Sequence, residues 1–307
     1  MNQRKSYDVI IIGGGPAGLS AGIYTARARL STLLVEKMAI GGQIINALEV
    51  ENYPGYKDGI SGVDLTLSMH EQATRFGVET FSDEVTGIKL EGGQKIVTTF
   101  TGEFAAKAVI LAGGSERQKI NVPGEKEYTG KGVSYCATCD GAFYRDKVVA
   151  VLGGGNSAVT EALELTKFAS KILLIHRRNE LRATKILQEK LLANPKIQPV
   201  WNTIVEEISG KQFVEKLKVK HAETNQPTEL DVSGVFVSVG TQPATGYLKG
   251  LINLDAGGAI IINDRLETNV PGIFAAGDIR SGSIKQVIAA AGDGAIAAVN
   301  AGKYISG

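Results

Sequence analysis

The stretch that decides the fold is Tyr7-Asp8-Val9-Ile10-Ile11-Ile12-Gly13-Gly14-Gly15-Pro16-Ala17-Gly18. Its first half is a short apolar run, typical of a strand buried on both faces of a parallel sheet. A helical pattern follows from Leu19 to Arg29, and Leu33-Leu34-Val35 predicts the next strand, which ends at Glu36. This order is that of a βαβ unit whose glycine-rich turn binds a dinucleotide pyrophosphate, while the acidic residue binds a ribose hydroxyl.

A second unit repeats this pattern in the same register. Its strand, turn, helix and following strand are expected at Val148–Leu152, Gly153–Ala158, Ala162–Phe168 and Ile172–Ile175. In this register Gly153 corresponds to Gly13, and His176 falls opposite Glu36. Two complete units in one register indicate two related dinucleotide-binding domains.

The C-terminal part of the chain predicts how these domains are connected. Leu266–Asp278 reads as an apolar strand that leads into a Gly-Asp turn, and Ser283–Tyr304 reads as a helix rich in small residues. These elements would complete the first domain, so the second domain is inserted within it. We therefore expect an α/β fold of two Rossmann-like domains, with the first formed by residues 1–116 and 245–307 and the second by residues 117–244. The crossings near Gly113–Lys119 and Gly240–Gly246 contain glycine and polar residues, as hinges do.

The second unit carries positive charge where the first carries a carboxylate. His176-Arg177-Arg178 takes the place of Glu36, and Arg182 follows about one turn later. Guanidinium groups bind a 2′-phosphate, which a carboxylate would repel, so the pattern predicts NADPH rather than NADH at this site. The alternative is a solvated strand end that binds nothing.

The chain contains only two cysteines, in Cys136-Ala137-Thr138-Cys139-Asp140. A CxxC pair at a helix start favours a thiolate, and Asp140 is the neighbouring candidate for a proton donor. A zinc site would need two further ligands, and the three histidines have no ligand-like spacing, so we expect no metal. A purely structural disulfide is not favoured, because a loop this short barely constrains the unfolded chain. Electrons could instead pass from one bound cofactor through another to the cysteines.

Composition and the N-terminal residues suggest a compartment and exclude some partners. Lys and Arg number 33 and Asp and Glu 32, so no polyanionic partner such as a nucleic acid is indicated. No apolar run is long enough to span a bilayer. Met1–Lys5 and the following apolar run faintly resemble a signal peptide, but the run is short and ends in glycines. We therefore expect a cytoplasmic protein.

Smaller motifs are consistent with a bound flavin. Gly41-Gly42-Gln43 and Glu51-Asn52-Tyr53-Pro54-Gly55 follow the first unit, and Gly277-Asp278 ends the tail strand. Glycine-rich segments can lie along an isoalloxazine ring, and an aspartate can bind a ribitol hydroxyl. A flavin would also relay electrons between a nicotinamide and a disulfide.

Together these motifs resemble bacterial-type, low-molecular-weight thioredoxin reductases along nearly the whole chain. The motifs are Gly13–Gly18, Gly41–Gln43, Val133–Gly141, Gly153–Ala158, His176–Arg178 with Arg182, and Phe274–Asp278. The resemblance implies FAD in the first domain, NADPH in the second, a homodimer, and thioredoxin as the disulfide substrate. It also implies that Cys139 reacts with the flavin, that Cys136 attacks thioredoxin and that Asp140 is the acid. In such enzymes the inserted domain rotates between the two half-reactions.

The resemblance assigns a set of binding residues to each nucleotide. Those for FAD are Gly13, Gly15, Pro16, Ala17, Gly18, Glu36, Gly42, Gln43, Asn52, Gly277, Asp278, Lys285, Gln286 and Val287. Those for NADPH are Gly153, Gly155, Asn156, Ser157, Ala158, His176, Arg177, Arg178 and Arg182.

The chain departs from the usual family pattern in three places. Ala112-Gly113-Gly114 replaces Ala-Thr-Gly, Lys285-Gln286-Val287 replaces Arg-Gln-Ala, and Tyr135 stands where a small residue is usual. The alternatives are a ferredoxin-dependent flavin thioredoxin reductase or a dithiol oxidase of the same fold, and a nucleotide-binding redox sensor that does not turn over. The first two relatives tend to lack the second fingerprint and its arginines, both of which this chain retains.

Overall fold

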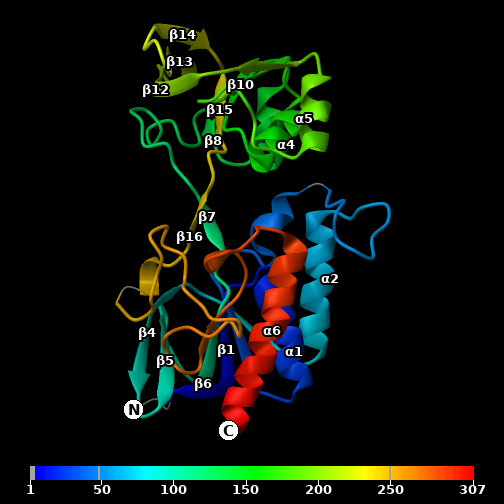
Figure 1. Ribbon diagram of the computed structural model, residues 1–307, viewed down its shortest axis with the longest axis vertical. Coiled ribbons are helices and arrows are strands. Elements are labelled where there is room, and N and C mark those ends of the chain that lie inside the picture. The colour runs from blue at the N-terminus through cyan, green and yellow to red at the C-terminus, as the bar shows by residue number, and fades with distance from the viewer. Residues whose placement is uncertain (1–3, 48, 249) are drawn as a thin grey trace. The chain divides into compact units, whose positions relative to one another are not determined.

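The computed structural model describes residues 4–47, 49–248 and 250–307 (Figure 1). Met1–Gln3, which open the leader-like stretch considered above, therefore lie outside the described residues. The chain divides into two compact units, one formed by the segments up to Glu116 and from Gln242, the other by Arg117–Thr241. Each unit contains its own sheet and its own apolar core.

The first unit is built on a seven-stranded sheet of order β3-β2-β1-β6-β5-β4, with β17 paired to β6. Its strands are β1 (Lys5–Ile12), β2 (Thr32–Glu36), β3 (Glu79–Ser82), β4 (Val85–Glu91), β5 (Gln94–Thr99), β6 (Glu103–Leu111) and β17 (Ile273–Ala275). The strands that follow crossovers pair in parallel, and the β4-β5-β6 meander is antiparallel.

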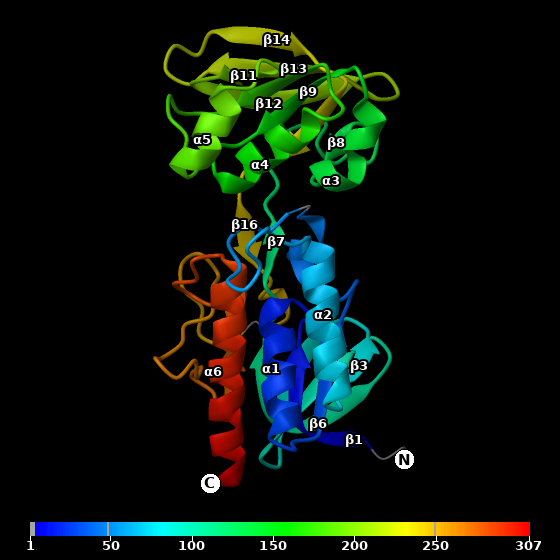
Figure 2. The same cartoon turned by 90° about the vertical axis from the view of Figure 1, so that its right-hand side faces the viewer.

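Three helices cover one face of this sheet, as Figure 2 shows. They are α1 (Pro16–Arg27), α2 (Gly62–Arg75) and α6 (Val287–Ser306). Because side chains alternate along a strand, Val9 and Ile11 of β1 pack under these helices, and Ile10 and Ile12 enter the core on the other face. Short 3-10 turns η1 (Gly42–Asn46), η3 (Gly246–Leu248) and η4 (Gly277–Ile279) complete the unit.

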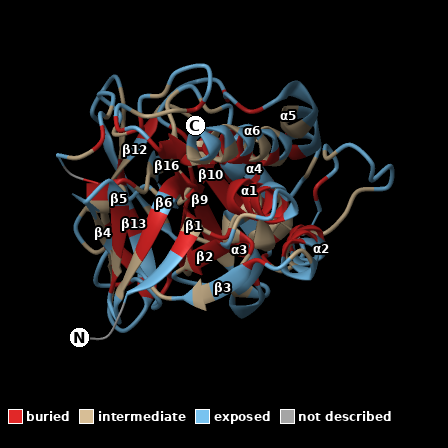
Figure 3. Cartoon of the chain, turned by 90° about the horizontal axis from the view of Figure 1, so that it is seen from below, coloured by how far each residue is buried: buried red, intermediate tan, exposed pale blue. Residues whose placement is uncertain are grey.

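The second unit has a five-stranded parallel sheet of order β11-β10-β9-β15-β8. Its strands are β8 (Val133–Ser134), β9 (Val148–Leu152), β10 (Lys171–Ile175), β11 (Ile197–Val200) and β15 (Gly234–Val237). The helices are α3 (Ala137–Asp140), α4 (Asn156–Leu165) and α5 (Lys185–Leu192), with the 3-10 turn η2 (Gly141–Tyr144) after α3. An antiparallel sheet, β12 (Thr203–Gly210), β13 (Val214–His221) and β14 (Pro227–Asp231), packs against the opposite face. The central strands are buried at Val149–Leu152 of β9 and at Ile172–Ile175 of β10, and Figure 3 colours the whole chain by burial.

The α/β class and the repeated βαβ unit expected from the sequence are confirmed. Some element bounds differ from the expected ones. Helix α4 begins directly at Asn156 and ends at Leu165, before Phe168. The tail strand is only β17, because Leu266 has a φ of 61° that interrupts extended backbone. Helix α6 begins at Val287 rather than Ser283, since Lys285 has a φ of 55° and cannot continue a right-handed helix.

The two crossings between the units pair with each other as short strands, β7 (Ser115–Arg117) and β16 (Thr241–Pro243). The second crossing reaches the first unit at Gln242 rather than after residue 244. The reason is that the Ala244 amide donates to the Gly114 carbonyl, and Leu248 enters the core beneath the first sheet. Among the described residues, no helix is long and apolar enough to cross a membrane.

Candidate redox and nucleotide-binding sites

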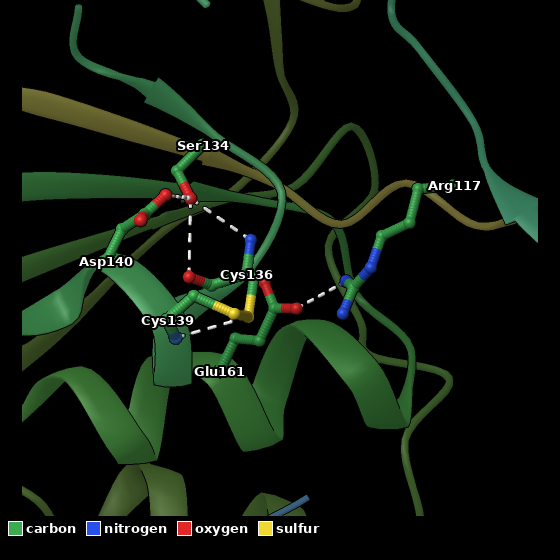
Figure 4. The surroundings of a disulfide bond; sticks show 6 residues. All are labelled: Arg117, Ser134, Cys136, Cys139, Asp140 and Glu161. Carbon is green, nitrogen blue, oxygen red and sulfur yellow. Dashed lines mark hydrogen bonds and ion pairs between the residues drawn. A yellow bond between two sulfur atoms is a disulfide. The ribbon is translucent and has the colours of Figure 1, made fainter. Parts of the chain in front are cut away.

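Cys136 and Cys139 form a disulfide at the start of α3 (Figure 4). Cys136 occupies the N-cap position, and the amide of Cys139 donates to Cys136 Sγ over 3.2 Å. Cys136 is half-buried and Cys139 is exposed. A backbone N–H aimed at sulfur stabilises negative charge there, so the local structure favours the thiolate of Cys136 once the bond is reduced.

The carboxyl group of Asp140 is held by a side chain that the sequence did not single out. Ser134 Oγ donates to Asp140 Oδ2 over 2.7 Å and accepts from the Cys136 amide over 3.0 Å. The Asp140 amide in turn donates to the Cys136 carbonyl over 3.1 Å. Tyr144 lies close by, and burial, followed by the charge of Asp140, raises the pKa of Tyr144.

A second residue missed from the sequence is Glu161 of α4. Figure 4 draws its carboxyl group in the surroundings of the disulfide, paired with the guanidinium of Arg117. Ala137, between the cysteines, packs in the same core cluster as Val159 and Ala162 of α4, so α4 supports the redox turn. Glu161 Oε2 is buried with no hydrogen-bond partner among the described residues. Burial raises the pKa of Glu161, and the opposing effect of Arg117 is smaller.

The first glycine-rich turn joins β1 to α1 and needs glycine at two positions for its own packing. Gly13 has a φ of 107°, and a Cβ there would collide with the carbonyl of Ala112. A Cβ on Gly18 would collide with the carbonyl of Gly13, so the helix can approach the strand only without one. Glu36 Oε2 accepts from the Gly14 amide over 2.6 Å, which fixes the carboxylate beside the turn.

Gly15 differs from these glycines, because nothing in the protein fills the space that its side chain would occupy. The nearest atom to a Cβ at Gly15 is the Cα of Gly42, at 3.8 Å, and the backbone φ of −77° suits any residue. Helix α1 starts directly afterwards with Pro16, so the space faces the positive end of a helix. An open cradle of this kind fits a dinucleotide pyrophosphate.

The structure pairs several of the other predicted flavin residues with distant parts of the first unit, and one of them, Gly277, reaches the turn itself. Asn52 Nδ2 donates to Gln286 Oε1 over 2.9 Å, across 234 positions of sequence. Gly277 lies against Ala17, and Ser283 Oγ donates to Asp278 Oδ1 over 2.9 Å. The Gln43 side-chain amide donates to the Ser115 carbonyl. Lys285 and Val287 are at the entrance to α6.

A cavity of about 300 Å³ extends from the first turn. It is lined by Gly13, Glu36 and Gly113, together with Tyr247. The cavity therefore extends from Glu36, which is expected to bind a ribose, to Gly113, which stands where the family usually has threonine.

The second turn, between β9 and α4, repeats the same backbone. Gly153 has a φ of 140°, and a Cβ there would collide with the carbonyl of Ser238. A Cβ on Gly155 would meet nothing within 4 Å, so this turn also leaves an open cradle at a helix start. Ala158 is buried at the position of Gly18, and Ser157 is exposed. Asn156 Oδ1 accepts from the Thr184 amide over 2.8 Å, so that side chain holds the loop before α5.

His176 and the neighbouring arginines lie in different surroundings. The His176 side chain is only 5% exposed and packs against Gly154, and its Nε2 has no partner among the described residues. Burial, followed by the positive charges of Arg182, Arg178 and Arg177, lowers the pKa of His176, so it is neutral at pH 7. Arg177, Arg178 and Arg182 are exposed. The three arginines after β10 are therefore more accessible to a phosphate group than His176 is.

No group of three His, Cys, Asp or Glu side chains within residues 4–47, 49–248 and 250–307 is arranged to hold a metal ion. The chemistry-bearing groups of the described structure are thus a disulfide with a neighbouring carboxyl group, and two open glycine turns in separate units.

Comparison with known proteins identifies the family. The sequence model of the pyridine nucleotide-disulphide oxidoreductases matches residues 7–294. A thioredoxin reductase of Peptoclostridium litorale is 48% identical over 99% of this chain and 98% of its own length. The crystal structure of a Lactococcus lactis thioredoxin reductase matches with a TM-score of 0.96 and 44% identity, over 98% of this chain and 99% of that one. The T. acidophilum thioredoxin reductase matches with a TM-score of 0.93 and 34% identity, with the same coverage. The chain therefore belongs to the pyridine nucleotide-disulphide oxidoreductase family and, within it, to the thioredoxin reductases.

Proposed function

We propose that this enzyme passes two electrons from NADPH, through FAD and the Cys136–Cys139 disulfide, to the disulfide of a thioredoxin. The family implies a flavin and a nicotinamide cofactor in general terms; FAD and NADPH are our specific assignments. The observation that carries the proposal is that the only two cysteines are bonded to each other, in a chain with two glycine turns that leave open space at a helix start.

The binding assignments follow from the chemistry around each cradle. FAD would be held by the first turn, with Gly15 leaving room for the pyrophosphate and Glu36 available to a ribose hydroxyl. NADPH would be held by the second turn, with Arg177 and Arg178 available to the 2′-phosphate. When bound, the flavin accepts a hydride equivalent from the nicotinamide and delivers two electrons to the disulfide.

The cysteines and Asp140 carry the exchange with the substrate. The Cys136 thiolate attacks one sulfur of the substrate disulfide, and a mixed disulfide forms as the second substrate sulfur leaves with a proton from Asp140. Cys139 then gives its proton to Asp140 and attacks Cys136 Sγ, which restores the Cys136–Cys139 bond and releases the first substrate sulfur. The enzyme's thiolate and thiol are oxidised to one disulfide, and one substrate disulfide is reduced to a thiol and a thiolate, which takes its proton from water. The Cys139 amide that faces Cys136 Sγ supports Cys136 as the attacking group.

Trapping decides which cysteine attacks. We expect Cys139→Ser to accumulate a mixed disulfide between Cys136 and a single-cysteine thioredoxin that carries thionitrobenzoate on its remaining sulfur, because Cys136 attacks that sulfur and thionitrobenzoate leaves as the thiolate. Cys136→Ser should accumulate much less. If the mixed disulfide accumulates in Cys136→Ser instead, Cys139 is the attacking sulfur and the two roles are reversed. This outcome has to be tested because Cys139 is the more exposed of the two residues.

We propose in addition that the enzyme is a cytoplasmic homodimer. Ile288, Ile296 and Val299 of α6 are 44%, 47% and 47% exposed, and their spacing places them on neighbouring faces of one helix. Apolar side chains exposed in this way are typical of subunit contacts. Sedimentation of the purified flavoprotein tests the dimer, and cell fractionation tests the compartment.

The first experiment is an anaerobic titration of the purified yellow protein with NADPH and separately with NADH, followed by oxidised thioredoxin. NADPH should bleach the flavin at low concentration, and thioredoxin should restore the colour in the wild type but not in Cys136→Ser. If neither nucleotide bleaches the flavin, the NADPH assignment is wrong, and reduced ferredoxin becomes the next electron donor to test. That alternative is not favoured, because relatives that are 44–48% identical to this chain over nearly its whole length are named thioredoxin reductases.

A further inference from the structure

Ser134 lies at the centre of a closed set of hydrogen bonds around the redox turn. Its hydroxyl oxygen accepts from the Cys136 amide at 3.0 Å and lies 2.7 Å from Asp140 Oδ2 and 3.3 Å from the Cys136 carbonyl oxygen. The Asp140 amide already donates to that carbonyl. Figure 4 shows Ser134 between Cys136 and Asp140, with dashed lines to both.

A serine hydroxyl has one proton to donate, so the two acceptors compete for it. The distance to Asp140 is that of a strong O–H···O⁻ bond, and the distance to the carbonyl is long for any O–H donor. The proton of Ser134 is therefore committed to Asp140. The same oxygen holds the Cys136 amide, so Ser134 links the carboxyl group to the backbone of the cysteine.

The position of Ser134 is itself fixed by the fold. It is 4% exposed and ends β8, which pairs with β15 through Phe236. The hydroxyl is thus presented by a buried strand end rather than by a flexible loop, and groups held by rigid elements keep their geometry best.

We propose that Ser134 is a positioning residue, whose hydroxyl holds the Asp140 carboxyl group and the Cys136 backbone in one arrangement throughout dithiol–disulfide exchange. A hydroxyl suits this task because it donates to a carboxylate and accepts from a carboxylic acid. The contact therefore survives when Asp140 gains or loses its proton. This inference rests on the proposed function, in which Asp140 is the acid.

The test compares Ser134→Thr with Ser134→Val in the flavin-loaded enzyme, since these side chains have nearly the same shape and differ in the hydroxyl. The threonine variant should retain activity. The valine variant should lower kcat for thioredoxin reduction about tenfold, as expected for one charge-assisted hydrogen bond, and leave KM for thioredoxin nearly unchanged. Flavin bleaching by NADPH should keep its wild-type rate in both variants, because it does not involve Asp140.

Thr99→Val is the matched control. Thr99 is also buried, and its hydroxyl donates to the Gly102 carbonyl at the β5–β6 turn of the other unit. This variant loses a hydroxyl and one hydrogen bond in the other unit, in a turn that contributes no residue to the proposed redox or nucleotide sites, so its kcat should match the wild type. A comparable loss of kcat in Thr99→Val would show that the readout reports general stability.

Combination with Asp140→Asn separates the inference from the proposed function. If Ser134 acts through Asp140, Ser134→Val should lower kcat no further in the Asp140→Asn background. A full additional loss, or a valine variant as active as the threonine variant, would overturn the positioning role. If Asp140→Asn alone leaves kcat unchanged, the acid in the proposed function is wrong, whatever Ser134 does.

Discussion

At the first glycine-rich turn, the strand that follows the helix ends in a carboxylate, whereas at the second it ends in a buried histidine followed by two exposed arginines. Glu36 is tied to its turn by a hydrogen bond from Gly14, and His176 meets its turn through ring packing against Gly154. The two turns are otherwise alike, because Gly15 and Gly155 have φ values of −77° and −95° and both leave open cradles. In the proposed function one backbone would therefore recognise a pyrophosphate in both units, and the residues after the second strand would determine which ribose is accepted.

The largest expected effect comes from removing the charge that distinguishes the second turn. The double variant Arg177→Ala/Arg178→Ala should raise the Kd for NADPH about 100-fold, because each guanidinium supplies a charge-assisted contact to the 2′-phosphate. The Kd for NADH should barely change. Calorimetric titration with each nucleotide measures both values.

Lys167→Ala/Lys171→Ala is the control, since it also removes two positive charges from exposed positions of the second unit. It should change the Kd for NADPH little. An equal loss of affinity for NADPH and NADH in the arginine variant would mean that Arg177 and Arg178 do not bind the 2′-phosphate.

The next effect tests what the two turns share. Gly15→Ala should weaken FAD binding about tenfold and leave NADPH binding intact, and Gly155→Ala should do the reverse, because each added methyl group enters one cradle only. The apoprotein should not be destabilised, since both backbones accept alanine and Gly→Ala restricts the unfolded chain. Flavin content, nucleotide titration and thermal melting check the three parts. An alanine variant that keeps full affinity would show that the cradle is not the pyrophosphate site.

A smaller effect is expected from Glu36→Gln, which replaces a carboxylate oxygen with an amide and weakens the bond from Gly14. The Kd for FAD should rise several-fold, about the effect of one neutral hydrogen bond, and the second turn should be unaffected. Measuring NADPH binding in the same variant provides the internal control. Unchanged FAD affinity would mean that Glu36 supports the turn but not the ribose.

The smallest effect is a pH dependence of stability at the second turn. Since the pKa of His176 is lowered in the folded protein, the unfolded chain binds the proton first as pH falls below about 6.5. The contribution of neutral His176 to the free energy of unfolding is therefore fully present above that pH. It is lost as the pH falls toward the pKa of His176 in the folded protein. Melting temperatures at pH 7.5 and 5.5 should differ by a few degrees more in the wild type than in His176→Gln. An equal difference would place the pH dependence elsewhere.

The features predicted from sequence are those in which residue type and spacing carry the chemistry by themselves. The glycine turns, the cysteine pair and the arginines after β10 could all be found in this way. Ser134 and Glu161 were missed because each is a single buried polar residue, at the end of β8 and within α4, and neither its type nor its spacing names a partner. Their partners, Asp140 and Arg117, become apparent only when the chain folds back on itself. The start of α6 was misplaced because nothing in the sequence reveals the left-handed backbone of Lys285.

The insertion of one unit within the other determines the order in which the parts of the nascent chain can fold during synthesis on the ribosome. Residues 117–241 form an uninterrupted segment with a complete core, so they can fold as soon as they emerge. The preceding residues must wait, because β17 pairs with β6, and α6 packs on α1 so closely that a Cβ on Gly294 would collide with the Ala17 backbone. Synthesis therefore leaves the first-made sheet incomplete until the last helix has been translated, and that interval is when its apolar face is open to chaperones.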